Sequence, residues 1–151
     1  MPLLESDVAA IAPEAGTPST DRAPDWVATG TPEPLRSQLV DLLGEDRVLS
    51  RASDIIRYAS DASPYRKLPQ VVIRARDAGD VGKVREYGRR TGRRVTFRAG
   101  GTSLNGQGQT DSILVDVRKH FGGVTVLDEG ARVKTGPGVV LGDVNKVLAP
   151  Y

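Results

Sequence analysis

The spacing of apolar residues along the chain predicts three helices. Leucines recur on one face over residues 34–43, with Thr31 as a possible N-cap, Pro34 in the first turn and Gly44 at the end. A second helix is predicted to begin at Asp77, a suitable N-cap, and to end at Gly92. A third is predicted over residues 140–148, where apolar residues again fall on one face.

Short β-branched runs predict the strands. The apolar run over residues 71–73 predicts a buried strand. The alternation of polar and apolar residues over 94–98 predicts a second strand, and the apolar run over residues 113–117 predicts a third. Strand, helix and strand over residues 70–98 predict a βαβ unit with parallel strands. Residues 124–135 read as a hairpin whose two-residue turn is Glu129-Gly130. Val48-Leu49 can form a short strand, residues 54–60 a helical turn, and residues 61–69 a loop.

Composition divides the chain at about residue 33. Residues 1–33 are rich in proline and alanine and carry six acidic residues against one arginine, whereas the rest carries 20 basic and 13 acidic residues. The first part holds too little apolar surface to offset chain entropy, so we expect a disordered leader over residues 1–33. With no cysteine, no signal peptide and no long apolar run, we expect a cytoplasmic protein without a membrane span.

The stretch with the most chemical information is the glycine-rich loop over residues 98–108. It follows a strand, and its glycines at 100, 101, 106 and 108 allow backbone amides to approach a ligand closely. Successive amides in a concave loop bind anions such as a pyrophosphate, and the hydroxyls of Thr102 and Ser103 add two donors. The alternative is a flexible connection between strands, which a glycine-rich loop alone does not exclude.

Two common phosphate loops are disfavoured by the residues that follow. Gly101 and Gly106 have the spacing of a Walker loop, but Gln107 and Gly108 stand where Lys and Ser or Thr are needed. The dinucleotide fingerprint G-x-G-x-x-G is absent, and no helix pattern starts directly after the loop. A nucleoside triphosphatase and a Rossmann dehydrogenase are therefore not expected.

The order of motifs is more specific than any one of them. Pro69-x-Val-Val-Ile-Arg, the helix opened by Asp80-Val81, the segment Val-Thr-Phe-Arg-Ala-Gly-Gly-Thr-Ser-Leu-Asn-Gly-Gln, Ile-Leu-Val-Asp116, the hairpin and Gly-Pro-Gly follow one another. Over residues 45–151 this order resembles the FAD-binding domain of the vanillyl-alcohol oxidase / p-cresol methylhydroxylase (PCMH) type, in the branch of D-lactate dehydrogenase and the glycolate oxidase FAD subunit.

This resemblance implies an α/β (α+β) fold: a small parallel βαβ-containing FAD subdomain, and the start of an antiparallel second subdomain that is truncated here, over residues 34–151. It implies that FAD is held non-covalently and that its pyrophosphate contacts the loop. It also implies that Pro69 lies near the adenine and that Gly138 enters the second subdomain. The implied cofactor-binding residues are Ala99, Gly100, Gly101, Thr102, Ser103, Leu104, Arg98, Pro69 and Gly138.

The resemblance also sets limits on the function. It implies a parent oxidoreductase that dehydrogenates a 2-hydroxy acid such as D-lactate or glycolate, with FAD as the hydride acceptor. Domains of this type continue past Tyr151, so no catalytic residue is assigned here. We expect a fragment that is inactive alone and retains FAD weakly, unless a separately encoded C-terminal remainder pairs with it. The flavin reductase of peptidoglycan precursor synthesis is a less favoured relative, because Leu104-Asn-Gly-Gln107 continues the loop differently.

Other polar residues have simpler interpretations. His120, the only histidine, is expected at a surface turn and not in a metal site, and Asp116 is expected to cap a turn. The arginines at 85, 89, 90, 93 and 94 form a basic cluster; a nucleic-acid-binding domain stays an alternative, but few aromatic residues are available to stack on bases. Arg98 has two open interpretations, a phosphate contact or a salt bridge with a neighbour such as Asp116.

Overall fold

A computed structural model describes residues 23–151 of the chain. Its elements, in order, are η1 (Asp25–Thr29), α2 (Leu35–Leu43), η2 (Glu45–Arg47), β1 (Val48–Leu49), α3 (Ala52–Arg57), β2 (Val71–Arg74), α4 (Ala78–Thr91), β3 (Val95–Arg98), β4 (Ile113–Asp116), β5 (Val124–Leu127), η3 (Asp128–Gly130), β6 (Arg132–Thr135) and α5 (Leu141–Leu148). The predicted mixed α/β fold is confirmed, and each predicted helix and strand is present within a few residues of its expected bounds.

The main sheet has the strand order β1-β2-β4-β3. Strands β2 and β3 each pair in parallel with β4, and β1 pairs antiparallel with β2. The parallel arrangement was predicted, but β2 and β3 are not neighbours, because β4 lies between them. The glycine-rich loop therefore carries the chain from the carboxyl end of β3 to the amino end of the adjacent strand β4.

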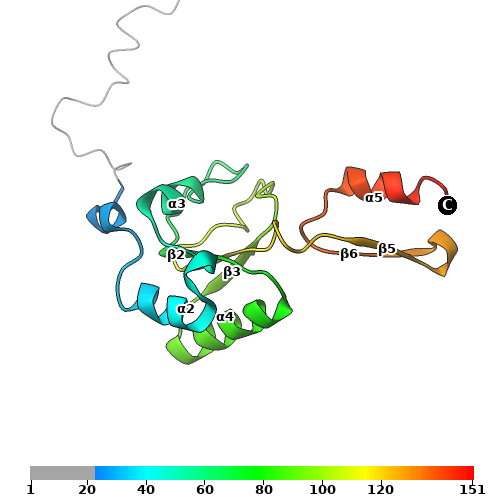
Figure 1. The fold of residues 1–151 in the computed structure, drawn as a ribbon. Helices are drawn as coiled ribbons and strands as arrows, with labels where there is room; N and C mark the ends of the chain where they lie inside the picture. The colour runs from blue at the N-terminus through cyan, green and yellow to red at the C-terminus, as the bar shows by residue number, and fades with distance from the viewer. Residues whose placement is uncertain (1–22) are drawn as a thin grey trace, which may run out of the picture.

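The central strands are buried on both faces because helices and loops cover each side. On one face Val71, Ile73, Ile113 and Val115 pack in one core with leucines of α2 and with Val84 and Tyr87 of α4. On the other face Val72 and Leu114, register partners, are also fully or almost fully buried. Figure 1 shows α2 and α4 below the sheet and α3 above it. This two-sided burial explains why β2 and β4 are continuous apolar runs.

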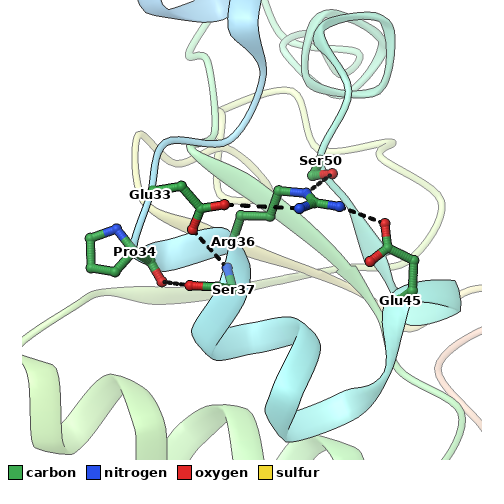
Figure 2. Close-up of polar contacts among 6 residues, drawn as sticks. All are labelled: Glu33, Pro34, Arg36, Ser37, Glu45 and Ser50. Atoms are coloured by element: carbon green, nitrogen blue, oxygen red, sulfur yellow. Dashed lines mark hydrogen bonds and ion pairs between the residues drawn. The ribbon is translucent and has the colours of Figure 1, made fainter.

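Helix α2 begins differently from the prediction. Pro34 is the N-cap residue itself, Thr31 does not cap, and the carboxylate of Glu33 accepts a hydrogen bond from the amide of Ser37 at 3.0 Å. Figure 2 shows Glu33 also facing Arg36, whose guanidinium reaches Glu45 and Ser50. The hydrogen bond from the Ser37 amide holds the pKa of Glu33 below its usual value. This network joins α2 to the segments around β1.

Helix α4 begins and ends where the sequence predicts. The side chain of Asp77 accepts a hydrogen bond from the amide of Asp80, and Gly92 ends the helix in the left-handed conformation with φ +68°. Gly88 lies against the neighbouring strand, because a Cβ there would approach Val95 Cγ2 to 2.6 Å and Arg93 O to 2.9 Å. The helix therefore packs closely on β3 and fixes that strand beside β4.

The hairpin β5–β6 and helix α5 form an arm that extends from the sheet body, on the right of Figure 1. The predicted two-residue turn is wrong: residues 128–131 connect the strands, with positive φ at Asp128, Glu129 and Gly130. Helix α5 buries Val144, but Val140, Leu141 and Val147 are 60%, 72% and 42% exposed. The predicted apolar face of α5 is therefore only partly covered by the described residues.

The start of the described chain is packed against the body. Val27 of η1 is 3% exposed, Thr31 is buried, and the amide of Thr31 donates to the carbonyl of Ser50. Over residues 23–33 the expectation of a disordered leader is therefore wrong; residues 1–22 of that predicted leader lie outside the described residues. Within residues 23–151, no helix is long and apolar enough to cross a membrane.

Candidate functional site

The loop that follows β3 presents a row of free backbone donors. Gly101 has φ +67° and Gly106 φ +74°, both left-handed values that favour glycine. Among the described residues, the amides of residues 100–104 donate to no protein acceptor, whereas Asn105 and Gln107 donate to Ser103 Oγ. Consecutive unpaired amides at positive-φ turns are the arrangement that binds anions.

The same residues line a concave surface. A depression of about 250 Å³ is bounded by residues 97–103 with Gln107 and Gly108. Gly100 leaves this surface open, since a Cβ there would meet only Thr102 Cγ2 at 3.6 Å. Five of the six predicted loop residues, Ala99, Gly100, Gly101, Thr102 and Ser103, therefore lie together around one hollow. The sixth, Leu104, projects outward and is 71% exposed.

Arg98 holds the base of the loop. Its Nη1 donates to the carbonyl of Tyr58 at 2.7 Å and its Nη2 donates to the carbonyl of Ser60. The guanidinium fills the space that a Cβ on Gly101 would need, 2.9 Å from Nε and 3.0 Å from Nη2. Arg98 makes no ion pair with Asp116 among the described residues, although the two are register partners on β3 and β4. The salt-bridge interpretation of Arg98 is therefore wrong.

Residues 58–66 support the glycine-rich loop from the side; the sequence predicted the end of a helical turn over residues 58–60 and a loop from residue 61 on. Buried Gln109 donates through Nε2 to Asp61 Oδ1 and to the Tyr65 carbonyl, each at 2.7 Å. The amide of Ala62 donates to the carbonyl of Gly101 at 2.9 Å. The hydrogen bond from the Ser63 hydroxyl, with smaller contributions from the Ser63 amide, Gln109 and the charge of Arg98, holds the pKa of Asp61 below its usual value against the opposing effect of desolvation. The polar residues Asp-Ala-Ser before Pro64 were the only sequence signal of this support.

Three charged residues form a row across the carboxyl ends of the parallel strands. Arg74 on β2 and Arg98 on β3 are both register partners of Asp116 on β4. Asp116 accepts hydrogen bonds from the Tyr58 hydroxyl and from the Arg118 amide, the second at 2.8 Å. The predicted turn-capping role of Asp116 is thus confirmed. Burial, and then the hydrogen bond to Asp116, raise the pKa of Tyr58.

Two further predicted residues lie away from this hollow. Pro69 is fully buried and precedes the amino end of β2, whereas Arg98 ends β3 at the opposite end of the sheet. Gly138 is in the connection between the body and the arm, where a Cβ would come within 2.2 Å of the Arg118 carbonyl. The structure does not bring either residue to the loop depression, and their cofactor contacts stay predictions.

The basic cluster at the end of α4 is mostly paired with neighbours. Arg89 forms an ion pair with Glu86 at 2.7 Å, Arg94 with Asp111 at 2.5 Å, and Arg93 donates to Gln70. These contacts favour a solvated surface over a phosphate-binding one. Along residues 23–151, no group of three or more metal-binding side chains occurs.

The fold and the site define a mixed α/β unit with a loop of unpaired amides, and comparisons with known proteins give its family. A profile described as "FAD binding domain" matches residues 69–151. The solved structure of 6-hydroxy-D-nicotine oxidase from Arthrobacter nicotinovorans is similar over 65% of this chain and 22% of its own, with 29% identity and a TM-score of 0.56. That of p-cresol methylhydroxylase is similar over 76% and 24%, with 16% identity and a TM-score of 0.58.

The chain belongs to the FAD binding domain family, and its cofactor is FAD. It is 35% identical over 97 residues to D-2-hydroxyglutarate dehydrogenase of Pseudomonas putida, and the aligned region covers 62% of this chain and 10% of the relative. It is 32% identical over 83 residues to (R)-6-hydroxynicotine oxidase of Paenarthrobacter nicotinovorans, covering 55% and 18%. The chain therefore spans only about a tenth to a fifth of the curated relatives it matches. The predicted resemblance to PCMH-type FAD domains is confirmed.

The residues present fit this cofactor. FAD carries a diphosphate, and the loop offers unpaired amides around a hollow that a Cβ at Gly100 would narrow. Among the described residues no carboxylate lines the hollow, and Arg98 brings a positive charge to it.

Proposed function

We propose that this chain supplies the phosphate-binding part of the FAD site in a flavin-dependent oxidoreductase, and that residues Ala99–Leu104 hold the FAD pyrophosphate. The observation that carries the proposal is the run of unpaired amides at residues 100–104 around the loop depression. In this role the amides of Gly100 and Gly101 donate to phosphate oxygens, and the hydroxyls of Thr102 and Ser103 add donors of the same kind.

Arg98 acts in this proposal mainly as a positioning residue. Its donors are directed to the carbonyls of Tyr58 and Ser60, so it fixes the shape of the loop and adds positive charge beside it. FAD, when bound, accepts a hydride from the substrate, and the chain contributes binding and orientation. Attachment of the flavin is proposed to be non-covalent, because His120, the only histidine, is exposed after β4 and does not line the loop depression.

The substrate class is proposed from the relatives. Several of them are D-2-hydroxyglutarate dehydrogenases. This supports the proposal that a full-length protein containing this domain oxidises a 2-hydroxy acid. D-Lactate or glycolate stay candidate substrates of the same class. No catalytic residue is proposed on this chain, which we expect to be inactive alone and to hold FAD weakly. A cytoplasmic location stays a prediction.

A pair of glycine variants tests the proposed site. Gly101 and Gly92 have nearly equal φ values, +67° and +68°, so an alanine strains the backbone similarly at either position. Only Gly101 lies in the loop; nothing lies within 4 Å of a Cβ at Gly92. We expect Gly101→Ala to weaken FAD binding by about tenfold or more, and Gly92→Ala to leave it unchanged. Both variants lose stability through the backbone, and Gly101→Ala loses more because its Cβ must displace the Arg98 guanidinium. Equal FAD affinities in the two variants, measured by flavin fluorescence titration, would contradict the proposal.

The arm favours a second possibility, that a separate polypeptide completes the site in trans. Val140, Leu141 and Val147 expose apolar surface that the described residues do not cover. Exposed apolar surface of this kind is typical of a face that packs on further protein. Co-expression with candidate C-terminal segments tests this: restored flavin absorbance in the co-purified complex supports pairing in trans, and unchanged weak retention with every segment excludes it.

A further inference from the structure

A second depression lies beside the loop, at the carboxyl ends of β2 and β4. It measures about 290 Å³ and shares the lining residues Arg98, Ala99 and Gly100 with the loop depression, so the two hollows are adjacent. In open sheets with parallel strands, ligands bind in the crevice outside the carboxyl ends of the strands. The position of this second hollow is therefore one at which a ligand group is expected.

The charges around this hollow are strongly unbalanced. Four arginines, at positions 57, 74, 98 and 118, line it together with one carboxylate, that of Asp116. Asp116 is 8% exposed, and its oxygens already accept hydrogen bonds from Tyr58 and from the Arg118 amide. One carboxylate cannot balance four guanidinium groups, so the hollow carries surplus positive charge.

Three of these four arginines form no ion pair with a described residue, and one of the three, Arg98, is committed to backbone carbonyls. Arg57 forms an ion pair with Asp54 at 2.9 Å, and Arg98 donates to two carbonyls. In contrast, the side chains of Arg74 and Arg118 make no ion pair with any described residue. The Nε of Arg74 is buried and has no acceptor.

A buried donor without an acceptor costs free energy, and the cost is greater for a charged group. A guanidinium group satisfies this need best with a carboxylate or phosphate, which accepts two parallel hydrogen bonds. The Tyr58 hydroxyl donates to Asp116 and also interacts with the side chain of Arg74; burial raises its pKa, so it stays protonated near neutral pH and adds no negative charge to the hollow. Asp116 thus orients Tyr58 and offsets only one of the positive charges around the hollow.

We propose that Arg74 and Arg118 form an oxyanion-binding subsite that takes a phosphate or carboxylate group lying next to the glycine-rich loop. Two sources supply this chemistry: a phosphate of the FAD itself, extending from the loop, or a separate small anion that binds at the same time as FAD. The proposal can be tested without FAD, so its failure and the failure of the loop proposal are distinguishable.

Inorganic phosphate is the probe, at constant ionic strength in chloride so that general screening stays equal. Nitrogen-15 spectra of the arginine side chains report on the subsite directly. Phosphate is expected to shift the Nε resonances of Arg74 and Arg118 in a saturable manner. Arg118→Gln and Arg74→Gln are each expected to weaken phosphate binding by about tenfold, the effect of losing one charge-assisted contact.

Arg89→Gln is the matched control, because Arg89 pairs with Glu86 on the surface of α4 and should leave phosphate binding unchanged. Arg118 is exposed, so its variant is expected to fold even where Arg74→Gln does not. Competition between phosphate and FAD assigns the anion to the cofactor, and simultaneous binding assigns it to a separate ligand. Non-saturable shifts, or an Arg118→Gln variant that binds phosphate as the parent chain does, would overturn the proposal.

Discussion

Nη1 of Arg98 donates to the carbonyl oxygen of Tyr58 at 2.7 Å, and this contact joins segments that are 40 residues apart in the sequence. It connects the last residue of β3 to the end of α3, next to the first residue of the glycine-rich loop. The conformation of the loop therefore depends on a segment that precedes the parallel strands.

Replacing Arg98 with lysine should loosen the loop while keeping the charge. A single ammonium group cannot donate to the Tyr58 and Ser60 carbonyls in the forked geometry of a guanidinium. We expect a loss of about 1–3 kcal/mol in the free energy of unfolding, measured with urea, and faster amide hydrogen exchange in residues 60–62. Arg94→Lys, which changes an exposed ion pair with Asp111, is the control and should cost less than about 1 kcal/mol. Equal losses in both variants would show that Arg98 does not anchor the loop.

Gln109, the residue that follows the glycine-rich loop, should be important for stability. Gln109→Leu keeps the approximate volume but removes hydrogen bonds to Asp61, Ser63 and the Tyr65 carbonyl. We expect it to lower the free energy of unfolding by about 1–3 kcal/mol, because buried acceptors lose their donor. Gln107→Leu, two residues earlier and exposed, should change stability by no more than about 0.5 kcal/mol. A tolerated Gln109→Leu substitution would mean that residues 58–66 hold their position without it.

A substitution at Gly100 tests how closely FAD approaches the backbone without adding backbone strain. Its φ is not positive, and an added Cβ would meet only Thr102 Cγ2 at an ordinary distance, 3.6 Å. Gly100→Ala should therefore fold with unchanged stability and bind FAD more weakly, because the methyl group stands between backbone and ligand. Gly82→Ala, in open space on α4, should leave FAD binding unchanged. Thermal unfolding and flavin titration of both variants test this, and unchanged FAD affinity in Gly100→Ala would contradict it.

The stabilising effect of Asp61 should depend on pH. Its folded-state pKa is lowered from 3.8, so the ionised carboxylate stabilises the fold above the pKa of the unfolded chain. This contribution should be lost as pH falls through the lower folded-state pKa. The stability difference between the parent chain and Asp61→Asn should therefore be largest near neutral pH and shrink below pH of about 4. A difference that grows on acidification, in urea unfolding at several pH values, would show the opposite sign of shift.

The sequence predicts the elements of this fold better than their arrangement. Helix α4 could be placed from Asp77 and Gly92 because both act through contacts within a few residues. The insertion of β4 between β2 and β3 could not be predicted, because apolar runs such as residues 113–116 fit any central strand. Likewise, the four-residue connection of the hairpin requires positive φ at Asp128 and Glu129, which neither residue type signals strongly.

In the candidate site, too, local features could be predicted from the sequence and contacts between distant segments could not. The loop residues 99–104 could be identified from glycine spacing and from the order of motifs. The support by Asp61 and Gln109 could not, because it joins residues 48 positions apart through side-chain contacts. The row of Arg74, Asp116 and Arg98 depends on strand register, and register is set by the three-dimensional pairing of β2, β4 and β3.

The most direct test of the central claim is a titration of the nitrogen-15-labelled chain with FAD, followed by its backbone amide resonances. This measurement detects weak binding, which we expect for this chain. The proposed site predicts that the amides of residues 100–104 shift most and saturate together, while those of the basic residues 85–94 hardly move. Absence of any saturable shift, or saturable shifts elsewhere with an unchanged loop, would contradict the assignment of the glycine-rich loop to the FAD pyrophosphate.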